Sequence, residues 1–552
     1  MGTMKTPGVY IVEKNAFPNS VVEVATAVPA FIGYTEKADN LGKPLRKQPW
    51  RISSMAEFVN YFGGPSTPIF SLSEPEPPKD TTAADSSDAD DAASTDDAPP
   101  ANFSMTVKGK TRGFSYLQKP GPAGGNYLLY RSMRLFYQNG GGPCYIVSVG
   151  DYSEDVEADK LMSGIKELLK EQEPTMVVLP DAVLLDKDNC TSVQQAALAH
   201  CGNKMRNRVA ILDVYDGWKA RQHPDGDCID QFRNALGINY LDFAMAYYPW
   251  LNTTIVQGNE LSSRNIEDKQ ELMRLIREEL SLPEKSADDA SPKEQQQNKA
   301  IDSLDYDEKQ WQAAIAKETG KEPEKILADE VKQHQILLDK SLIAMSPVFN
   351  SLLTEMKNQL NILPPAAAMA GIYSMVDSTR GVWKAPANVS LSAVVSPTVN
   401  ITHDDQEDLN VTVQGKSINA IRPFIGEGTL VWGARTLDGN SLDWRYISVR
   451  RTMIMLEESI RLAAKAYVFE NNTANTWVTI NSMISNFLTG IWKRGGLAGA
   501  SPADAFSVHV GLGDTMTAVD ILEGIMRITV LVALVRPAEF IEITFQQQMQ
   551  KS

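Results

Sequence analysis

Between residues 127 and 250, short segments made almost wholly of apolar residues alternate with amphipathic ones. A strand without a polar face is typical of a parallel sheet that is covered on both sides. The amphipathic segments Ala158–Lys170 and Val193–Met205 have helical spacing. This alternation predicts an α/β domain with a largely parallel sheet. The predicted strands are Tyr145–Val149, Met176–Leu179, Val209–Val214 and Phe243–Tyr248.

The acidic charge of the chain is concentrated in two segments. The formal net charge of the chain is −16. Residues 74–100 contain nine acidic residues and one basic residue, and residues 260–332 contain nineteen acidic and twelve basic residues. The rest of the chain is nearly neutral. A general nucleic-acid binder needs a basic surface, so this class of function is excluded.

The two acidic segments differ in their apolar content. The insert Ser73–Asn102 contains no Leu, Ile, Val, Met or aromatic residue, so we expect it to be disordered and exposed. It is interpreted as a passive loop, with an acidic docking tail as the alternative. Residues 258–340 are predicted to form a helical insert, with Met273, Ile276 and Leu280 on one stripe that Ile266 extends.

Both ends of the chain have β-branched segments that prolines separate from the rest. Near the N-terminus, Pro7 precedes Val9–Val12, Pro18 precedes Val21–Val24, and Pro29 precedes Phe31–Tyr34. Near the C-terminus, Pro537 precedes Phe540–Phe545. Such segments cannot bury themselves, so each is predicted to be a tail or to pair with a sheet elsewhere. Ile525–Val535, before Pro537, is expected to be a buried strand.

Residues 385–440 are predicted to be mostly short strands and loops, and two helices follow. Val449, Leu456 and Tyr467 lie on the stripe of the first helix, which is expected to end at Asn471-Asn472. The second stripe runs from Trp477 to Ile491 and stops at Gly495-Gly496. Core packing of a C-terminal α+β domain is the expected role of both stripes.

No catalytic, cofactor or metal site is predicted. Gln414–Ser417 ends like a phosphate loop but lacks its glycine-rich turn, and Gly499–Ala503 lacks the last glycine of a nucleophile elbow. His200 and the four cysteines match no zinc spacing, so the thiols are expected to be reduced and mostly buried. The longest apolar run, Ile528–Val535, is too short to span a membrane, and no signal peptide is recognised.

Three blocks of sequence together resemble the contractile tail sheath proteins of phages and of phage-tail-like contractile injection systems. The likeness covers the first 35 residues and most of 345–548. The first block is Thr6–Tyr10 with Val28–Tyr34. The second block is Pro364-Pro365, Gly371–Tyr373 and Asp377 with Arg380–Asn388. The third block is Ile421-Arg422, Val431–Leu437, Trp444–Ile447, Arg450-Arg451 and Arg536–Phe540.

This resemblance implies a structural protein rather than an enzyme. Family members assemble as helically stacked hexameric rings around an inner tube and contract to drive the tube through a target envelope. The implied partners are further copies of the chain, the inner tube protein, the baseplate and the tail-terminator or cap proteins. Terminal arms add strands to a sheet in a neighbouring subunit. The expected arm residues are Val9, Tyr10, Ile11, Val12, Val21, Val22, Val24, Phe540, Ile541, Ile543 and Phe545.

The expected organisation is an N-terminal arm (1–30), an α/β domain with the two inserts (31–395), a C-terminal α+β domain that packs on the inner tube (396–536), and a C-terminal arm (537–552). Trp477, Lys493 and Arg494 are candidates for tube contact, although the basic pair is also suited to capping a helix C-terminus.

Three other functions stay open: the sheath of a contractile phage or prophage, a non-helical structural or binding protein that has kept a sheath fold, and an α/β enzyme without a recognisable motif. We expect synthesis and assembly in the bacterial cytoplasm, with no direct membrane insertion, and then release as part of an extracellular particle. A particle that stays in the cytoplasm or is anchored to a membrane is the alternative.

Overall fold

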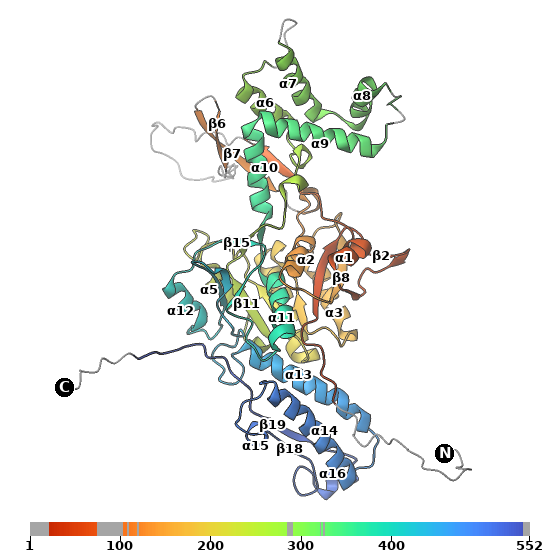
Figure 1. Cartoon of the computed structure of the whole chain (residues 1–552), viewed down its shortest axis with the longest axis vertical. Helices are drawn as coiled ribbons and strands as arrows, with labels where there is room; N and C mark the ends of the chain where they lie inside the picture. Colours follow the sequence, from red (N-terminus) through yellow and green to blue (C-terminus); the bar gives the residue numbers. More distant parts are fainter. Residues whose placement is uncertain are drawn as a thin grey trace, which may run out of the picture.

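The computed structural model describes residues 21–73, 103–107, 110–118, 121–283, 291–320, 322–323 and 326–544. Predictions for Val9, Tyr10, Ile11, Val12, Phe545 and the acidic insert 74–102 lie outside these residues. The described chain forms three parts that follow one another along the long axis of the molecule (Figure 1). A helical lobe lies at one end, an α/β domain in the middle and a small C-terminal domain at the other end.

A nine-stranded sheet forms the centre of the α/β domain. Its middle strands are parallel, and antiparallel strands close both edges. Mixed α/β architecture with a mostly parallel sheet is thus confirmed. In sheet order the strands are β14 (Val389–Ser390), β17 (Gly428–Val431), β16 (Asn419–Phe424), β11 (Ala244–Tyr248), β10 (Val209–Asp213), β9 (Met176–Val178), β1 (Pro29–Thr35), β8 (Cys144–Asp151) and β4 (Trp50–Ile52).

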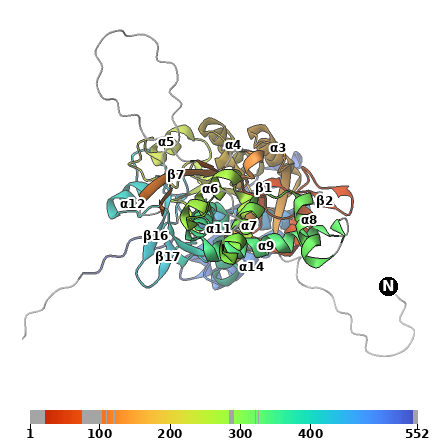
Figure 2. The ribbon, with the colours of Figure 1, turned by 90° about the horizontal axis from the view of Figure 1, so that it is seen from above.

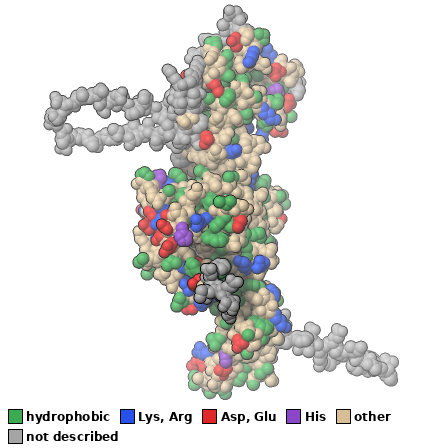
Figure 3. Space-filling view, turned by 60° about the vertical axis from the view of Figure 1, so that its left-hand side comes forward, with side chains coloured by type: hydrophobic (Ala, Val, Ile, Leu, Met, Phe, Trp, Pro, Cys, Tyr) green, Lys and Arg blue, Asp and Glu red, His purple; other side chains and the backbone are tan. Residues whose placement is uncertain are grey.

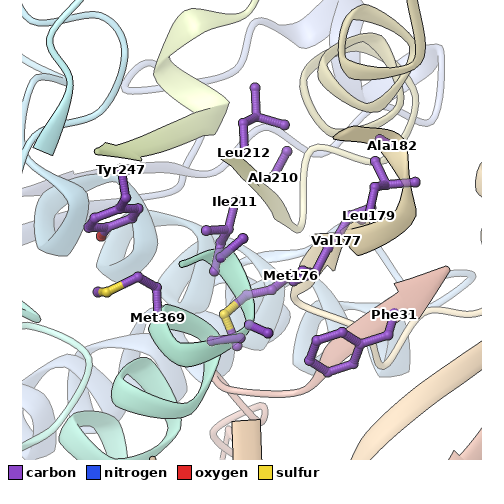
Figure 4. Close-up of a cluster of buried hydrophobic side chains, with 14 of the residues drawn as sticks. Phe31, Met176, Val177, Leu179, Ala182, Ala210, Ile211, Leu212, Tyr247 and Met369 are labelled. Atoms are coloured by element: carbon purple, nitrogen blue, oxygen red, sulfur yellow. The ribbon is translucent and has the colours of Figure 1, made fainter. Parts of the chain in front are cut away.

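Helices cover both faces of this sheet because successive side chains of its strands point to opposite sides. In β1, Phe31 packs edge-on against Phe136 of α2 (Leu129–Gln138), while Ile32 approaches Gly164 of α3 (Ala158–Glu167). Figure 4 shows Phe31 in one buried cluster with Met176, Ile211 and Met369. Further helices of this domain are α1 (Met55–Phe62), α4 (Lys187–Ala199), α5 (Cys228–Ala235), α11 (Ala366–Arg380) and α12 (His403–Asn410).

One prediction for this domain is confirmed and one needs correction. The segment Phe31–Tyr34 pairs with a sheet, which is one of its two predicted alternatives: β1 lies fully buried between β8 and β9, and burial of its seven residues offsets the entropy lost when they are ordered. The helix predicted from Val193 begins at Lys187, since the Asp186 side chain accepts a hydrogen bond from the Asn189 N–H and caps it. Its last turn, His200–Met205, is a π-helix.

The sheet also crosses the predicted domain boundary between residues 395 and 396. β14 precedes the boundary, while β16 and β17 follow it and pair into the same sheet. The helix α12 lies in the region expected to hold mostly short strands and loops. Three small sheets complete this part of the chain and the base of the lobe. Their strands are β2 (Asp39–Asn40) and β3 (Lys43–Pro44); β12 (Leu251–Thr253), β13 (Ile362–Leu363) and β15 (Val394–Pro397); and β5 (Phe70–Ser73), β6 (Phe103–Val107) and β7 (Lys110–Gln118).

The predicted helical insert forms the lobe, with its own apolar core. Met273, Ile276 and Ile266 are all buried in this core, although Ile266 precedes the helix and forms an isolated bridge with Phe70. Among the described residues, no single helix is long and apolar enough to cross a membrane; α9 and α10 pass that test only as a pair bent by 111°. The lobe helices are α6 (Lys269–Leu280), α7 (Pro292–Asp302), α8 (Glu308–Thr319), α9 (Ala328–Met345) and α10 (Pro347–Leu360).

The C-terminal domain contains the two long helices that the sequence predicts. Ile480, Ile484 and Ile491 are buried in its core, with Leu456 from the preceding helix. The segment 525–535 is not a buried strand: only Thr529–Val532 is extended, and its side chains alternate between half-buried and exposed. The elements are α13 (Ile447–Ala464), α14 (Ala474–Lys493), α15 (Pro502–Ala505), β18 (Phe506–His509), α16 (Ala518–Leu522) and β19 (Thr529–Val532).

A buried carboxyl group at the end of β10 should make the stability of the α/β domain depend on pH. Burial raises the pKa of Asp213 to about 7, although the Ala366 N–H donates to its carboxylate at 2.8 Å. Since this pKa lies above the unfolded value of about 3.9, the stabilising contribution is complete below pH 4 and is lost as pH rises through 7.

We therefore expect Asp213→Asn to gain stability relative to the wild type on going from pH 5 to pH 8, by about 1–3 kcal/mol. Chemical denaturation at both pH values measures this. Asp188→Asn, the same change at an exposed site, is the control. An equal effect of Asp213→Asn at both pH values would contradict the prediction.

Candidate assembly sites

The C-terminal domain contains a two-stranded sheet with open edges. β18 and β19 pair antiparallel from Phe506↔Val532 to His509↔Thr529, and neither joins a third strand among the described residues. One face is covered, because Val508 and Val530 pack on the core formed with α14. A two-stranded sheet is marginal in water, and unpaired edge groups accept a strand from another chain.

The C-terminal arm is anchored to the α/β domain by Glu539. The Arg435 side chain donates to the Glu539 carboxylate at 2.7 Å, the Asn410 amide at 2.8 Å and the Tyr446 hydroxyl at 3.2 Å. Burial acts to raise the pKa of Glu539, but the hydrogen bonds from Arg435 and Asn410 outweigh it, so the pKa is lowered. The carboxylate is therefore charged at neutral pH and pairs with a buried guanidinium.

Beyond this anchor the arm leaves the body of the molecule. Phe540, Ile541 and Ile543 are 74%, 79% and 70% exposed. Residues 540–544 form no strand in the single chain, so their pairing with a neighbouring sheet stays a prediction. Figure 2 shows this segment leaving the molecule beside β16 and β17.

The described part of the N-terminal arm runs across the C-terminal domain without forming a strand. Val21 and Val24 are partly buried on its core, whereas Val22 is exposed. The Val24 N–H donates to the Ser459 hydroxyl at 3.1 Å, and Arg451 donates to the Thr26 carbonyl at 3.0 Å.

The root of this arm is fixed by a second buried arginine. Arg451 also pairs with Asp377 of α11 at 2.6 Å, and both side chains are almost completely buried. Sequence reasoning did not assign roles to Arg435, Arg451, Asp377 or Glu539. All four nevertheless stand in the blocks that resemble the sheath family, and that was the signal available.

The three candidate tube-contact residues do not form one site. Trp477 and Lys493 lie at opposite ends of α14, about 24 Å apart along its axis. The Trp477 indole donates to the Asn472 side chain at 2.7 Å. Lys493 and Arg494 are both exposed, but Arg494 already pairs with Glu23 of the N-terminal segment and lies 5.2 Å over the Trp383 ring.

The near-miss catalytic motifs serve structural purposes. Lys416 is buried with its ammonium donating to the Arg233 carbonyl, and a strand rather than a helix follows it. His200 is buried near Arg208, and burial followed by that positive charge lowers its pKa to about 4. All four cysteines are free and buried, as predicted. The described residues contain no cluster of three or more potential metal ligands.

Removing the Glu539 carboxylate should release the arm. We expect Glu539→Ala to lower the free energy of unfolding by about 2 kcal/mol, because the Arg435 guanidinium would remain buried without its counter-ion. Hydrogen exchange in residues 435–446 should become faster. Glu542→Ala, three residues further along the arm, is the control and should change neither quantity; equal effects of both variants would rule out a specific anchor.

Comparison with known proteins shows that this chain is similar to phage tail sheath proteins. Residues 440–548 match the phage tail sheath C-terminal domain. The tail sheath proteins of Enterobacteria phage T4 and Vibrio phage KVP40 are 24% and 28% identical over 135 and 138 residues, 24% of this chain in each case. The chain spans about a fifth of the length of these curated relatives.

Two solved structures match over the whole length of the chain. The contracted helical sheath of the anti-feeding prophage is 25% identical with a TM-score of 0.55, covering 99% of this chain and 100% of that one. The contracted PVC sheath complex of an extracellular contractile injection system is 24% identical with a TM-score of 0.55, covering 100% and 99%. The described chain thus has the sheath fold, and its residues 440–548 belong to the family of phage tail sheath C-terminal domains.

Proposed function

We propose that this chain is the structural subunit of a contractile sheath. Copies assemble as helically stacked hexameric rings around an inner tube, and contraction drives the tube through a target envelope. The observation that carries this proposal is the whole-length likeness to injection-system sheaths, combined with an exposed C-terminal arm and an open two-stranded sheet.

Strand exchange between subunits supplies the connection. An arm that pairs with β18 or β19 of a neighbour satisfies backbone groups on both chains, and this link persists when the rigid domains rotate. Because arm and acceptor are different surfaces, each contact is heterologous and propagates into a helical assembly instead of closing a dimer.

Contraction requires subunit interfaces with two arrangements, of which the contracted one has the lower free energy. Small differences then sum over many copies. The partners of the chain in this proposal are further copies of itself, the inner tube protein, the baseplate and the terminator or cap proteins. Similarity to a chain from the anti-feeding prophage baseplate structure supports the association with a baseplate.

An extracellular contractile injection system is the particle that we favour, because the whole-length structural matches come from the anti-feeding prophage and PVC systems. The sheath of a contractile phage or prophage is the second candidate, favoured by the sequence matches to phage tail sheath proteins. We further propose assembly in the bacterial cytoplasm followed by release of the particle.

The C-terminal domain faces the inner tube in this proposal. The acidic helical lobe lies at the opposite end of the molecule and faces outward (Figure 1). Its charge would then lie on the outside of the particle.

Electron microscopy of the purified protein tests the assembly. We expect wide, ridged tubes from the wild type and only folded single subunits from a Phe540→Glu/Ile543→Glu variant, because charges at these positions block burial of the arm. Glu542→Gln, between the two positions, should form tubes as the wild type does. Tubes of normal yield from the double variant would contradict strand exchange by this arm.

Tube contact is tested at Lys493 alone, because Arg494 also holds the N-terminal segment. We expect Lys493→Glu sheaths to retain less than a tenth of the inner tube protein in co-purification, while sheath assembly is unchanged. Lys465→Glu, at the end of α13, is the matched charge reversal and should retain the tube. Unchanged retention in Lys493→Glu would remove this residue from the interface.

A further inference from the structure

Large apolar side chains are exposed on the α/β domain beside the root of the C-terminal arm. Val411, Val413 and Leu442 are 57%, fully and 69% exposed. They come from two loops that lie side by side, since the Gly439 N–H donates to the Gly415 carbonyl at 3.0 Å. We call these three residues the arm-root face.

The arm-root face borders the Glu539 anchor on two sides. Val411 directly follows Asn410, whose amide donates to the Glu539 carboxylate. Leu442 directly precedes Asp443, which lies 3.9 Å from the Arg536 guanidinium at the start of the arm. Figure 3 shows hydrophobic side chains exposed on this side of the α/β domain.

From this arrangement we propose that the arm-root face is a docking surface for a second copy of this chain, the copy that receives the C-terminal arm. This inference rests on the proposed sheath function and names one of its subunit interfaces. Exposed apolar residues that gather in one place mark interaction sites.

The short reach of the C-terminal arm indicates which molecule covers the arm-root face. Ile543 is four residues from Glu539, so even a fully extended chain carries it no more than about 14 Å from the anchor. A copy that buries Phe540 and Ile543 must therefore approach the surface around Glu539 closely. The arm-root face is the surface that it meets there, and an apolar contact avoids the repulsion between like charges of identical copies.

Charge insertion tests the interface. We expect Val413→Glu/Leu442→Glu to reduce the sedimentable, tube-forming fraction at least tenfold, while the monomer keeps the wild-type melting temperature. The matched control is Leu327→Glu/Leu337→Glu, two exposed leucines of the helical lobe. Control variants should assemble as the wild type does; a loss of tubes equal to that of the test variant would overturn the proposal.

A cross-linking experiment identifies the occupant. Because the four native cysteines are buried, a benzophenone maleimide on Leu442→Cys labels that position selectively. Irradiated tubes should give dimers of this chain on denaturing gels. Wild-type assembly combined with only monomeric product would overturn the interface and leave the sheath function standing, whereas an absence of tubes from the wild-type protein would contradict the sheath function itself.

Discussion

Unpaired backbone groups at sheet edges are the constraint on which the architecture depends. The nine-stranded sheet closes its own edges with the short antiparallel strands β4 and β14, of three and two residues. The sheet formed by β18 and β19 has no such cover among the described residues. The nine-stranded sheet is thus protected against pairing with strands of other chains, whereas the sheet of β18 and β19 remains open to such pairing. This difference fits a rigid central body whose connections to other copies are concentrated in the small C-terminal domain.

Buried arginines fix the points at which the arms leave that body. Arg435 holds Glu539, and Arg451 holds both Asp377 and the Thr26 carbonyl. A guanidinium suits this task because it stays charged and donates several hydrogen bonds in a fixed geometry. An arm under tension would therefore pull on the α/β domain through defined ion pairs. In a contracting assembly, such anchors would convert movement of a neighbouring copy into rotation of a whole subunit.

The sequence predicts those parts of the fold in which local pattern and burial agree. The predictions of the apolar strands from Tyr145 to Tyr248 are correct because short continuous apolar runs are typical of strands buried on both faces. The predicted stripes of α13 and α14 are correct because their apolar residues recur with the helical period. Local pattern leaves alternatives open where distant partners decide: β1 resembles the arm strands in composition, and its position is fixed by pairing with β8 and β9. The helix α12 had a local signal, since Thr402 and Asp405 form a reciprocal capping box. The ion pair between Arg435 and Glu539 joins residues 104 positions apart, which spacing alone does not reveal.

Charge placement links this fold to its proposed assembly. The acidic lobe lies at the far end of the molecule from the C-terminal domain. If the C-terminal domains line the tube, the lobes of one ring lie at the largest radius and thus furthest from one another. Coulomb repulsion between exposed charges is screened within about 8–10 Å at physiological salt, so even a modest separation makes it small. Contraction widens the ring and separates the lobes further. The net negative charge therefore opposes aggregation between particles without opposing either state of the sheath, and the nearly neutral remainder of the chain is free to form the contacts between copies.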